Sequence, residues 1–223
     1  MNKSKILEFF DATKVKVPVN IIGVGAVGSN VTLNLAHMGF EELHIWDFDT
    51  VEAHNITNQM YTEDQVGMLK VEACAQNIKA VNPNCDVIIH PEGLVDDYTI
   101  NGIVFMCVDN IDLRREIVEA NQYNKYCKCI NDFRMRLTDA QYYFADMKKP
   151  KDVDKLLRTM QFSHDEAKDA TPKSACNVEL SVMYTVNAIC ALGVANCVKW
   201  ILNPEDYKFT ILLDTNIMEL QVF

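Results

Sequence analysis

The sequence predicts an α/β fold with a Rossmann-like, mostly parallel sheet that antiparallel strands continue and that helices cover on both faces. Short apolar runs alternate with helix-like segments through residue 132. These runs lack the polar–apolar alternation of half-exposed strands, as expected where helices cover both faces of a sheet. Beyond residue 133, strand-like segments follow one another, which is typical of antiparallel pairing. We expect one domain over residues 1–223, with a nucleotide-binding half (1–132) and a second half (133–223).

The first half is expected to open with a short amphipathic helix around residues 6–10, ahead of Pro18. Strands and helices then alternate. Hydrophobic periodicity and punctuation by glycine, asparagine and proline place them at residues 17–25, 27–38, 42–49, 62–81, 85–90, 102–109, 111–126 and 127–132.

The second half is expected to hold antiparallel strands around one long helix. The strands are predicted at residues 134–138, 140–146, 207–214 and 217–223. Residues 147–177 are polar, and their portion HDEAKDATPKSAC predicts a crossover loop. Residues 180–198 carry no charge and are long enough to span a membrane. Asn187 and Asn196 would be costly in lipid, so a helix in the core or at a subunit contact is the better interpretation.

Composition narrows the function. The formal charge of −10 argues against a nucleic-acid partner, because binding a phosphate backbone needs a basic face. The N-terminal residues are too often charged for a secretory signal, so a cytoplasmic location is expected. Eight cysteines include no CxxC; Cys127 and Cys129 would share one strand face, with no second pair at zinc spacing. Buried thiols, and no structural zinc, are expected.

Gly23, Gly25 and Gly28 form GxGxxG between a predicted strand and a predicted helix. The first permits a tight turn, the second lets the backbone approach a phosphate, and the third lets helix and strand pack closely. Asp47 ends the second strand, where a carboxylate can accept hydrogen bonds from ribose hydroxyls. A nucleoside phosphate is the expected ligand, with NAD and ATP equally compatible and a role in packing alone as the alternative.

The stretch DFDTVEAHNITNQMYTEDQVGMLKVEA resembles the signature of the ThiF/MoeB/HesA family of adenylyltransferases, relatives of the ubiquitin-activating enzymes. The resemblance continues at VNP (81–83), CVDNIDLR (107–114) and FRMRLTDAQYYF (133–144), and more weakly at ACNVELSVM (175–183). The chain is identified as a divergent member. The resemblance implies that a carboxylate attacks the α-phosphate of ATP and expels pyrophosphate. It implies as acceptor the C-terminal glycine of a small ubiquitin-like or sulfur-carrier protein, and a homodimer joined partly through residues 178–202.

The resemblance also implies roles for particular residues. Asp47 would hold the ribose, Asn55 and Gln59 would contact phosphates, and Asp49 and Asn58 lie in the same nucleotide-binding stretch.

Two charged residues are implied to act on the phosphates. Lys70 would balance their charge, and an ammonium serves well as a point countercharge. Asp109 would coordinate Mg²⁺, which takes oxygen ligands and keeps several waters. The local alternatives are a solvated helix lysine for Lys70 and a helix cap for Asp109. Arg114, matching a family arginine, is equally compatible with a helix cation that pairs with a neighbouring acid.

The chain departs from the family pattern where cations are expected. Asn58 replaces an arginine and His54 a serine, and no N-terminal segment resembles the family's arginine-bearing one. Losing such an arginine can cost on the order of 10³ to 10⁵ in phosphoryl-transfer rate. The cations that could compensate are Lys14, Lys16, Arg134 and Arg136.

Two further functions therefore stay open: a catalytically weakened nucleotide-binding scaffold that recruits a partner, and an NAD-dependent oxidoreductase, for which no catalytic constellation is recognisable. Cys176 lies where thiol-using family members place their cysteine, with an inert buried thiol as the alternative. His164 has no partner at motif spacing and is expected at the surface.

Overall fold

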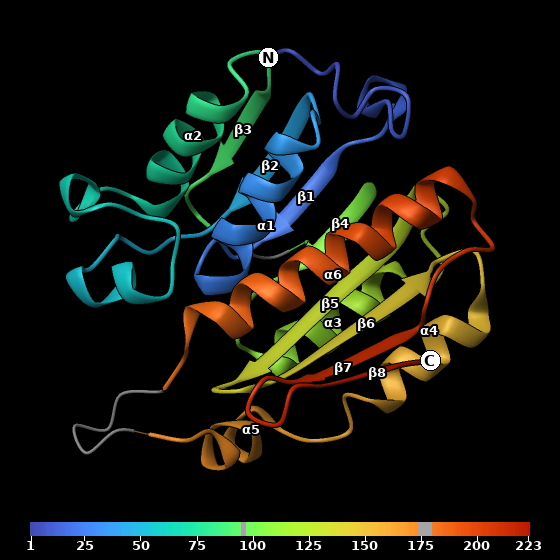
Figure 1. Cartoon of the computed structure of the whole chain (residues 1–223). Helices are drawn as coiled ribbons and strands as arrows, with labels where there is room; N and C mark the ends of the chain where they lie inside the picture. Colours follow the sequence, from blue (N-terminus) through green and yellow to red (C-terminus); the bar gives the residue numbers. More distant parts are fainter. Residues whose placement is uncertain (95–96, 174–179) are drawn as a thin grey trace.

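The computed structural model describes residues 1–94, 97–173 and 180–223, and in them one mixed sheet lies between two layers of helices (Figure 1). The strands are β1 (Val19–Ile22), β2 (Glu42–Trp46), β3 (Asp86–His90), β4 (Gly102–Met106), β5 (Cys127–Arg136), β6 (Asp139–Asp146), β7 (Thr210–Asp214) and β8 (Glu219–Val222). The α-helices are α1 (Ala26–His37), α2 (Lys70–Val81), α3 (Ile111–Asn121), α4 (Pro150–Arg158), α5 (His164–Ala170) and α6 (Met183–Leu202). Three 3-10 helices are η1 (Ala12–Lys14), η2 (Ala53–Thr57) and η3 (Glu63–Gln65).

The strands are ordered β3-β2-β1-β4-β5-β6-β7-β8. The first five run parallel; in the register of β1, Ile21 lies opposite Ile45 on one side and Phe105 on the other. β5 pairs parallel with β4 and antiparallel with β6, and β7 and β8 continue the antiparallel part. The predicted fold class is therefore confirmed, and β5 extends through residue 132, where the two predicted halves meet.

Helices α1, α2 and α6 cover one face of the sheet, and α3 and α4 cover the other (Figure 1). α6 packs on α1 and across β5 and β6. A Cβ on Gly193 of α6 would lie 2.4 Å from the Phe133 ring and 2.8 Å from Tyr142, so a glycine is needed for this close approach. By length and composition α6 could cross a membrane, but half of its most apolar window is buried within the protein. The helix expected in the core or at a subunit contact thus packs its buried half on α1, β5 and β6.

Local signals set the starts of α3 and α4. The side chain of Asn110 caps α3 by accepting hydrogen bonds from the amides of Asp112 and Leu113. Pro150 is the first residue of α4, where its missing N–H costs nothing. Six of the cysteines that the structure describes are buried, as expected: Cys74, Cys85, Cys127, Cys129, Cys190 and Cys197.

Three predicted elements were wrong. Residues 4–9 form hydrogen-bonded turns instead of a helix, and Phe9 is 65% exposed, so the segment offers no apolar face long enough to hold a helix on the core. The helix predicted over 62–81 begins at Lys70, because Gly67 at φ +91° separates it from η3. The crossover loop predicted at residues 164–176 contains α5.

Candidate functional site

Gly23 and Gly25 lie in the loop between β1 and α1, and Gly28 lies in the first turn of α1. Gly23 has a φ of +86°, a left-handed conformation that glycine adopts without strain. A Cβ on Gly28 would lie 1.9 Å from the carbonyl oxygen of Gly23, so the loop and α1 can approach only with glycine there. An added Cβ at Gly25, which precedes α1, would meet no atom within 4 Å. The loop therefore leaves open space before the free amides of a helix N-terminus, which attract anions.

Asp47 joins this loop to the end of β2. Its Oδ2 accepts a hydrogen bond from the amide of Val24 at 2.8 Å, and its Oδ1 accepts one from the amide of Asp49 at 2.9 Å. Burial raises the pKa of the Asp47 carboxyl above its ordinary value, and the two amide hydrogen bonds oppose that shift. Asp47 has an acceptor lone pair left on each oxygen, so it can receive a further donor such as a ribose hydroxyl.

Lys70 lies at the start of α2 with 8% of its surface exposed. Its Nζ is 2.8 Å from Asp49 Oδ2, and the amide of Lys70 donates to the Asp49 carbonyl at 2.9 Å. The two residues thus hold the start of α2 against the loop after β2. The solvated lysine considered as the alternative is wrong, because the ammonium is part of the wall of the site.

A cavity of about 620 Å³ opens between these elements at the carboxyl ends of the parallel strands. Of the residues predicted to bind nucleotide, it is lined by Gly23, Gly25, Asp47, Asp49, Asn58, Gln59, Lys70 and Asp109. Gly28 lies behind the loop, in the role of close packing that the sequence analysis gave it.

Asn55 does not line the cavity. It is 8% exposed, and its Oδ1 accepts a hydrogen bond from the amide of Glu52 at 2.9 Å, as part of the capping box of η2. The structure therefore places Asn55 where it supports the loop after β2, and the phosphate contact expected for it has no counterpart in this geometry.

Asp109 is exposed at the end of β4, and the capping role considered for it belongs to Asn110 instead. The Asp109 carboxylate is thus available to the cavity. The described residues include no cluster of three or more His, Cys, Asp or Glu side chains able to hold a metal. A single carboxylate fits Mg²⁺ only where a ligand's phosphates and waters complete the coordination.

Several residues that line this cavity have a buried polar atom without a hydrogen-bond partner. In the described part of the chain, five buried side-chain polar atoms lack a hydrogen-bond partner: Trp46 Nε1, Gln59 Oε1, Asn82 Oδ1, His164 Nδ1 and Ser181 Oγ. All of them except Asn82 belong to residues that line the cavity. Leaving a buried polar group unpaired costs about 1 to 3 kcal/mol, so a ligand or a side-chain shift that gave these atoms partners would be favourable.

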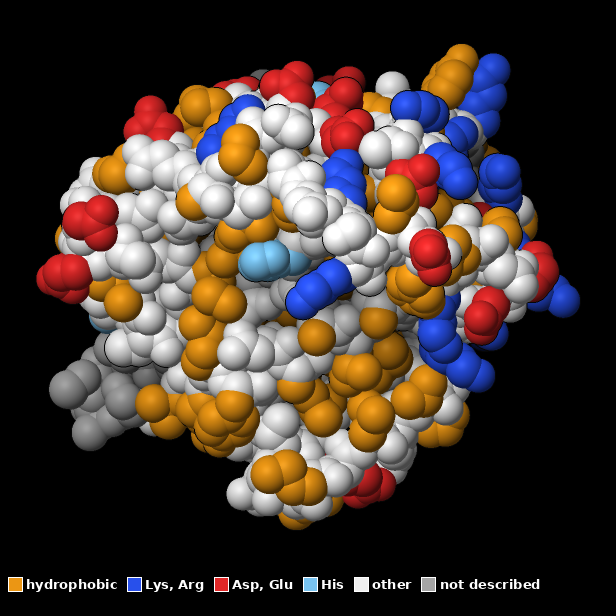
Figure 2. All heavy atoms as spheres, turned by 45° about the horizontal axis from the view of Figure 1, so that its top comes forward, with side chains coloured by type: hydrophobic (Ala, Val, Ile, Leu, Met, Phe, Trp, Pro, Cys, Tyr) orange, Lys and Arg blue, Asp and Glu red, His pale blue; other side chains and the backbone are white. Residues whose placement is uncertain are grey.

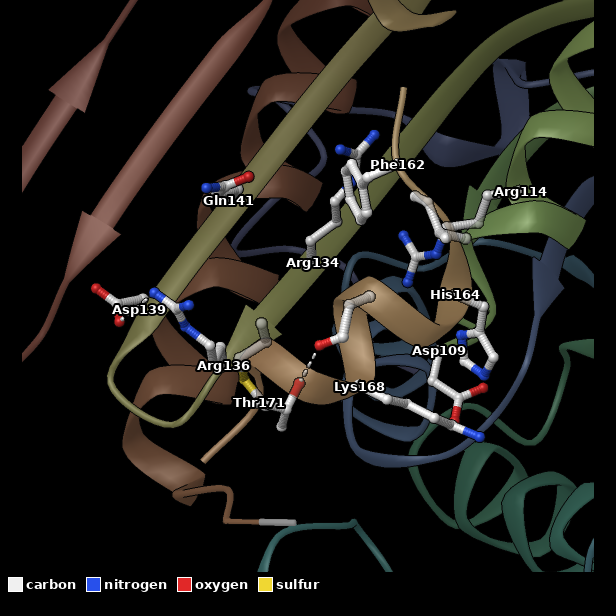
Figure 3. Close-up of a pocket in the computed structure, with 13 residues that line it drawn as sticks. Asp109, Arg114, Arg134, Arg136, Asp139, Gln141, Phe162, His164, Lys168 and Thr171 are labelled. Carbon is white, nitrogen blue, oxygen red and sulfur yellow. Dashed lines mark hydrogen bonds and ion pairs between the residues drawn. The ribbon is translucent and has the colours of Figure 1, made fainter. Parts of the chain in front are cut away.

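A second cavity of about 290 Å³ continues from the first, between β5, β6 and α5 (Figure 3). Both cavities are lined by Asp109, Arg114, Met135, His164, Lys168 and Thr171. Arg134, Arg136, Asp139 and Gln141 line the second cavity alone. The site is thus an extended channel, with the glycine loop at one end and arginines of β5 at the other.

Asp132 is fully buried between two of these arginines. Arg114 forms an ion pair with Asp132 Oδ1 and donates to the carbonyl oxygen of Val108. Arg134 lies 2.6 Å from Asp132 Oδ2 and also donates to the carbonyl oxygen of Thr159 at 2.7 Å. For Arg114, the structure therefore favours the pairing alternative.

The compensating cations expected from the sequence do not reach the open space at the glycine loop. Arg134 is engaged by Asp132, and Arg136 lies 3.5 Å from Asp139. Lys16 lines a separate cavity at the amino ends of β1 and β2, opposite the glycine loop, and Lys14 is 82% exposed beside Asp11.

The contribution of α5 to the site was not predicted from the sequence. His164, expected at the surface, is half-buried and lines both cavities, and so does Lys168 one helical turn later. The signal was present: Ser163 and Glu166 have the spacing of a capping box, and the structure contains that box at the start of α5. Cys176 lies outside the described residues, so its predicted role stays a prediction.

The fold and the loop geometry define an α/β protein with a Rossmann-like glycine loop at the carboxyl edge of a mostly parallel sheet. A family model described as "ThiF family" matches residues 12–223, and the chain belongs to this family. The family resemblance drawn from the sequence is confirmed.

Relatives and solved structures agree with this assignment. Ubiquitin-like modifier-activating enzyme 5 of Drosophila pseudoobscura pseudoobscura is 30% identical over 158 residues, which is 62% of this chain and 38% of that protein. The enzyme of the same name from Drosophila persimilis is 32% identical over 140 residues, 54% of this chain and 35% of that protein. The chain thus spans less than two fifths of the length of these relatives.

Solved structures share the fold. PaaA superposes with a TM-score of 0.72 at 19% identity, covering 93% of this chain and 64% of that one. E. coli MccB with ATP superposes with a TM-score of 0.71 at 20% identity, covering 95% of this chain and 65% of that one. At these identities the likeness establishes the fold alone.

Proposed function

We propose that this chain binds ATP in the 620 Å³ cavity and transfers its adenylyl group to a carboxylate, releasing pyrophosphate. The observation that carries the proposal is that Asp47, Lys70 and Asp109 line the same cavity, at the carboxyl ends of the parallel strands, as the open space at Gly25. In Rossmann-like sheets, ligands bind at this carboxyl edge, with phosphate at the helix start. The ATP named in one MccB structure supports the nucleotide.

Each residue of the proposed ATP site has a role that suits its chemistry. Gly25 and the first amides of α1 would receive phosphate, and Asp47 would accept a ribose hydroxyl. Lys70 would place positive charge at the phosphates by exchanging part of its contact with Asp49. Asp109 would hold Mg²⁺ together with the phosphates, and that ion would neutralise charge on the departing pyrophosphate.

The acceptor is proposed to be the C-terminal glycine carboxylate of a small ubiquitin-like or sulfur-carrier protein. Its extended tail would enter through the second cavity, which is continuous with the first. The names of the relatives, ubiquitin-like modifier-activating enzymes, and a structure of MccB with MccA support a protein or peptide acceptor.

A homodimer is proposed through the outer face of α6. Exposed positions on this helix, Tyr184, Asn187, Ala191 and Ala195, recur at helical spacing and form a stripe that carries no charge before Lys199 in the last turn. Figure 2 shows a face of the molecule on which hydrophobic side chains gather with few charges among them. Light scattering after gel filtration tests this: Ala191→Arg is expected to halve the mass of the particle, and an unchanged mass would contradict this contact.

Isothermal titration with Mg·ATP and with NAD tests the nucleotide. Gly25→Ala is the informative variant, because its Cβ would meet no atom within 4 Å, so the fold is expected to persist while ATP binding is lost. Full ATP affinity in a folded Gly25→Ala protein would contradict the proposed phosphate position. Binding of NAD in place of ATP would favour the oxidoreductase alternative.

Pyrophosphate exchange tests the reaction. With a ubiquitin-like protein that ends in glycine, an adenylyltransferase incorporates labelled pyrophosphate into ATP. ATP binding without exchange would favour the catalytically weakened scaffold. This alternative remains because Asn58 stands where the family has an arginine.

A further inference from the structure

Helix α5 crosses the point where the two cavities meet. His164 and Lys168 are four residues apart, so they share one face of the helix. Both side chains line both cavities, together with Asp109. Figure 3 shows His164, Lys168 and Asp109 extending into the same part of the pocket.

Among the described residues, Lys168 is the one cation lining the two cavities that has no ion-pair or hydrogen-bond partner. Lys70 contacts Asp49 at 2.8 Å, Arg114 and Arg134 share buried Asp132, and Arg136 lies 3.5 Å from Asp139. These and Lys168 are all the lysines and arginines that line the two cavities. In the described ranges, no ion pair or hydrogen bond engages the ammonium of Lys168.

His164 offers a second polar group at the same place. Its Nδ1 is buried without a hydrogen-bond partner among the described residues. Leaving a buried polar atom unpaired costs about 1 to 3 kcal/mol, and no hydrogen bond from Nδ1 to a described residue holds the ring in place.

The position of α5 is set by contacts at its amino end. Ser163 and Glu166 form a capping box, and the amide of His164 donates to Asp112 Oδ2 at 3.3 Å. Arg115 of α3 donates to the carbonyl oxygen of Phe162 at 2.7 Å. Lys168 thus extends from an element that is anchored on α3, so its ammonium is delivered to a defined region.

We propose that α5 completes the nucleotide site, with Lys168 as a cation that binds the phosphate chain of ATP and His164 as a hydrogen-bonding group beside it. The proposal rests on the proposed ATP binding and assigns it a residue from the second half of the chain. An ammonium without a protein partner keeps its full charge for phosphate oxygens, and charge-assisted hydrogen bonds are the strong ones.

The test compares ATP with adenosine by isothermal titration. Lys168→Ala is expected to weaken ATP binding about tenfold, the loss of one charge-assisted contact, and to leave adenosine binding within about twofold. His164→Ala is expected to cause a smaller loss for ATP alone. Lys168→Arg is expected to keep most of the ATP affinity. Lys151→Ala removes the same charge from an exposed position on α4, outside both cavities, and serves as the matched control.

A second substitution tests whether the lost positive charge, and not the altered shape of the side chain, weakens ATP binding. Asn58 lines the larger cavity, so adding Asn58→Arg to Lys168→Ala returns a cation to it and is expected to recover ATP affinity. The proposal is overturned if Lys168→Ala binds ATP like the unaltered protein, if adenosine binding falls equally, or if Asn58→Arg recovers nothing. An unaltered protein that fails to bind ATP would overturn the proposed function as well, so the two failures are distinguishable.

Discussion

The backbone amide of Val24 donates a hydrogen bond to Asp47 Oδ2 over 2.8 Å, joining the glycine loop after β1 to the end of β2. The other oxygen of Asp47 accepts from the amide of Asp49, which in turn contacts Lys70. A single carboxylate thus positions the three segments that surround the proposed phosphate site. The shape of the site depends on Asp47 even before any ligand binds.

Asp47→Ala is expected to lower the free energy of unfolding by about 1 to 3 kcal/mol, because it leaves two amides without their acceptor. Asp47→Asn keeps one acceptor oxygen and is expected to lose less. Chemical denaturation measures both, and ATP titration is expected to show weaker binding in both variants. Equal stability of Asp47→Ala and the unaltered protein would contradict the anchoring role.

The pH dependence of stability has a sign that follows from the raised pKa of Asp47. The folded state holds the proton more tightly than the unfolded state, whose pKa is near 3.8. The contribution of this carboxyl group is therefore largest at low pH and is lost as pH rises through the folded pKa. The difference in unfolding free energy between the unaltered protein and Asp47→Asn should fall as pH rises from about 3.8. A difference in unfolding free energy that stays constant with pH would contradict a raised pKa of Asp47 in the folded state.

Gly28→Ala is expected to destabilise the fold by about 3 kcal/mol, at the upper end of typical overpacking costs. The added Cβ would lie 1.9 Å from the backbone oxygen of Gly23, which no side-chain rotation can relieve. Thermal unfolding measures the effect. Gly25→Ala, three residues away, is the control and is expected to be nearly neutral for stability. Gly28→Ala should therefore impair folding, whereas Gly25→Ala should impair ATP binding.

Asp132→Asn is expected to cost about 3 to 5 kcal/mol, because it leaves Arg114 and Arg134 buried with an unbalanced charge. Asp139→Asn breaks the half-exposed pair with Arg136 and is expected to change stability by less than about 1 kcal/mol. Denaturant midpoints compare the two. Similar losses in both variants would show that the buried pairs carry no special weight.

The buried thiols give a prediction at alkaline pH. Burial raises the pKa of Cys74 to about 12 and that of Cys85 to about 11, from an ordinary 9.0. Unfolded thiols ionise first, so these groups lose their stabilising contribution as pH rises from about 9 towards 11. At pH 8, iodoacetamide should modify the peptide containing Cys74 in denatured but not in folded protein, as mass spectrometry would resolve. Equal labelling would contradict the burial.

Much of the first half could be predicted from the sequence because its signals are local. The glycine spacing, the buried strands and Asp47 at the end of β2 each have a short-range cause, and the structure contains all of them. The start of α2 was misplaced because helical periodicity continues across Gly67, whose φ of +91° breaks the backbone without breaking the hydrophobic pattern.

The second half was harder because its site residues act through distant contacts. α5 has seven residues, none of them buried, so no hydrophobic stripe marks it. The placement of His164 and Lys168 depends on the contact of α5 with α3, about fifty residues earlier in the chain. The ion pair between Arg134 and Asp132 likewise depends on strand geometry, because residues 132 and 134 lie on the same face of β5.

Strand β5 has a consequence for any attempt to divide this protein. It pairs with β4 along one edge and with β6 along the other, and the stretch from Cys129 to Asp132 belongs to both ladders. A break between residues 132 and 133 would leave each fragment with an unsatisfied edge that only the other can pair. Co-expressed fragments are therefore expected to reassemble through this strand. Dividing the chain here would not separate the nucleotide end of the channel from the acceptor end.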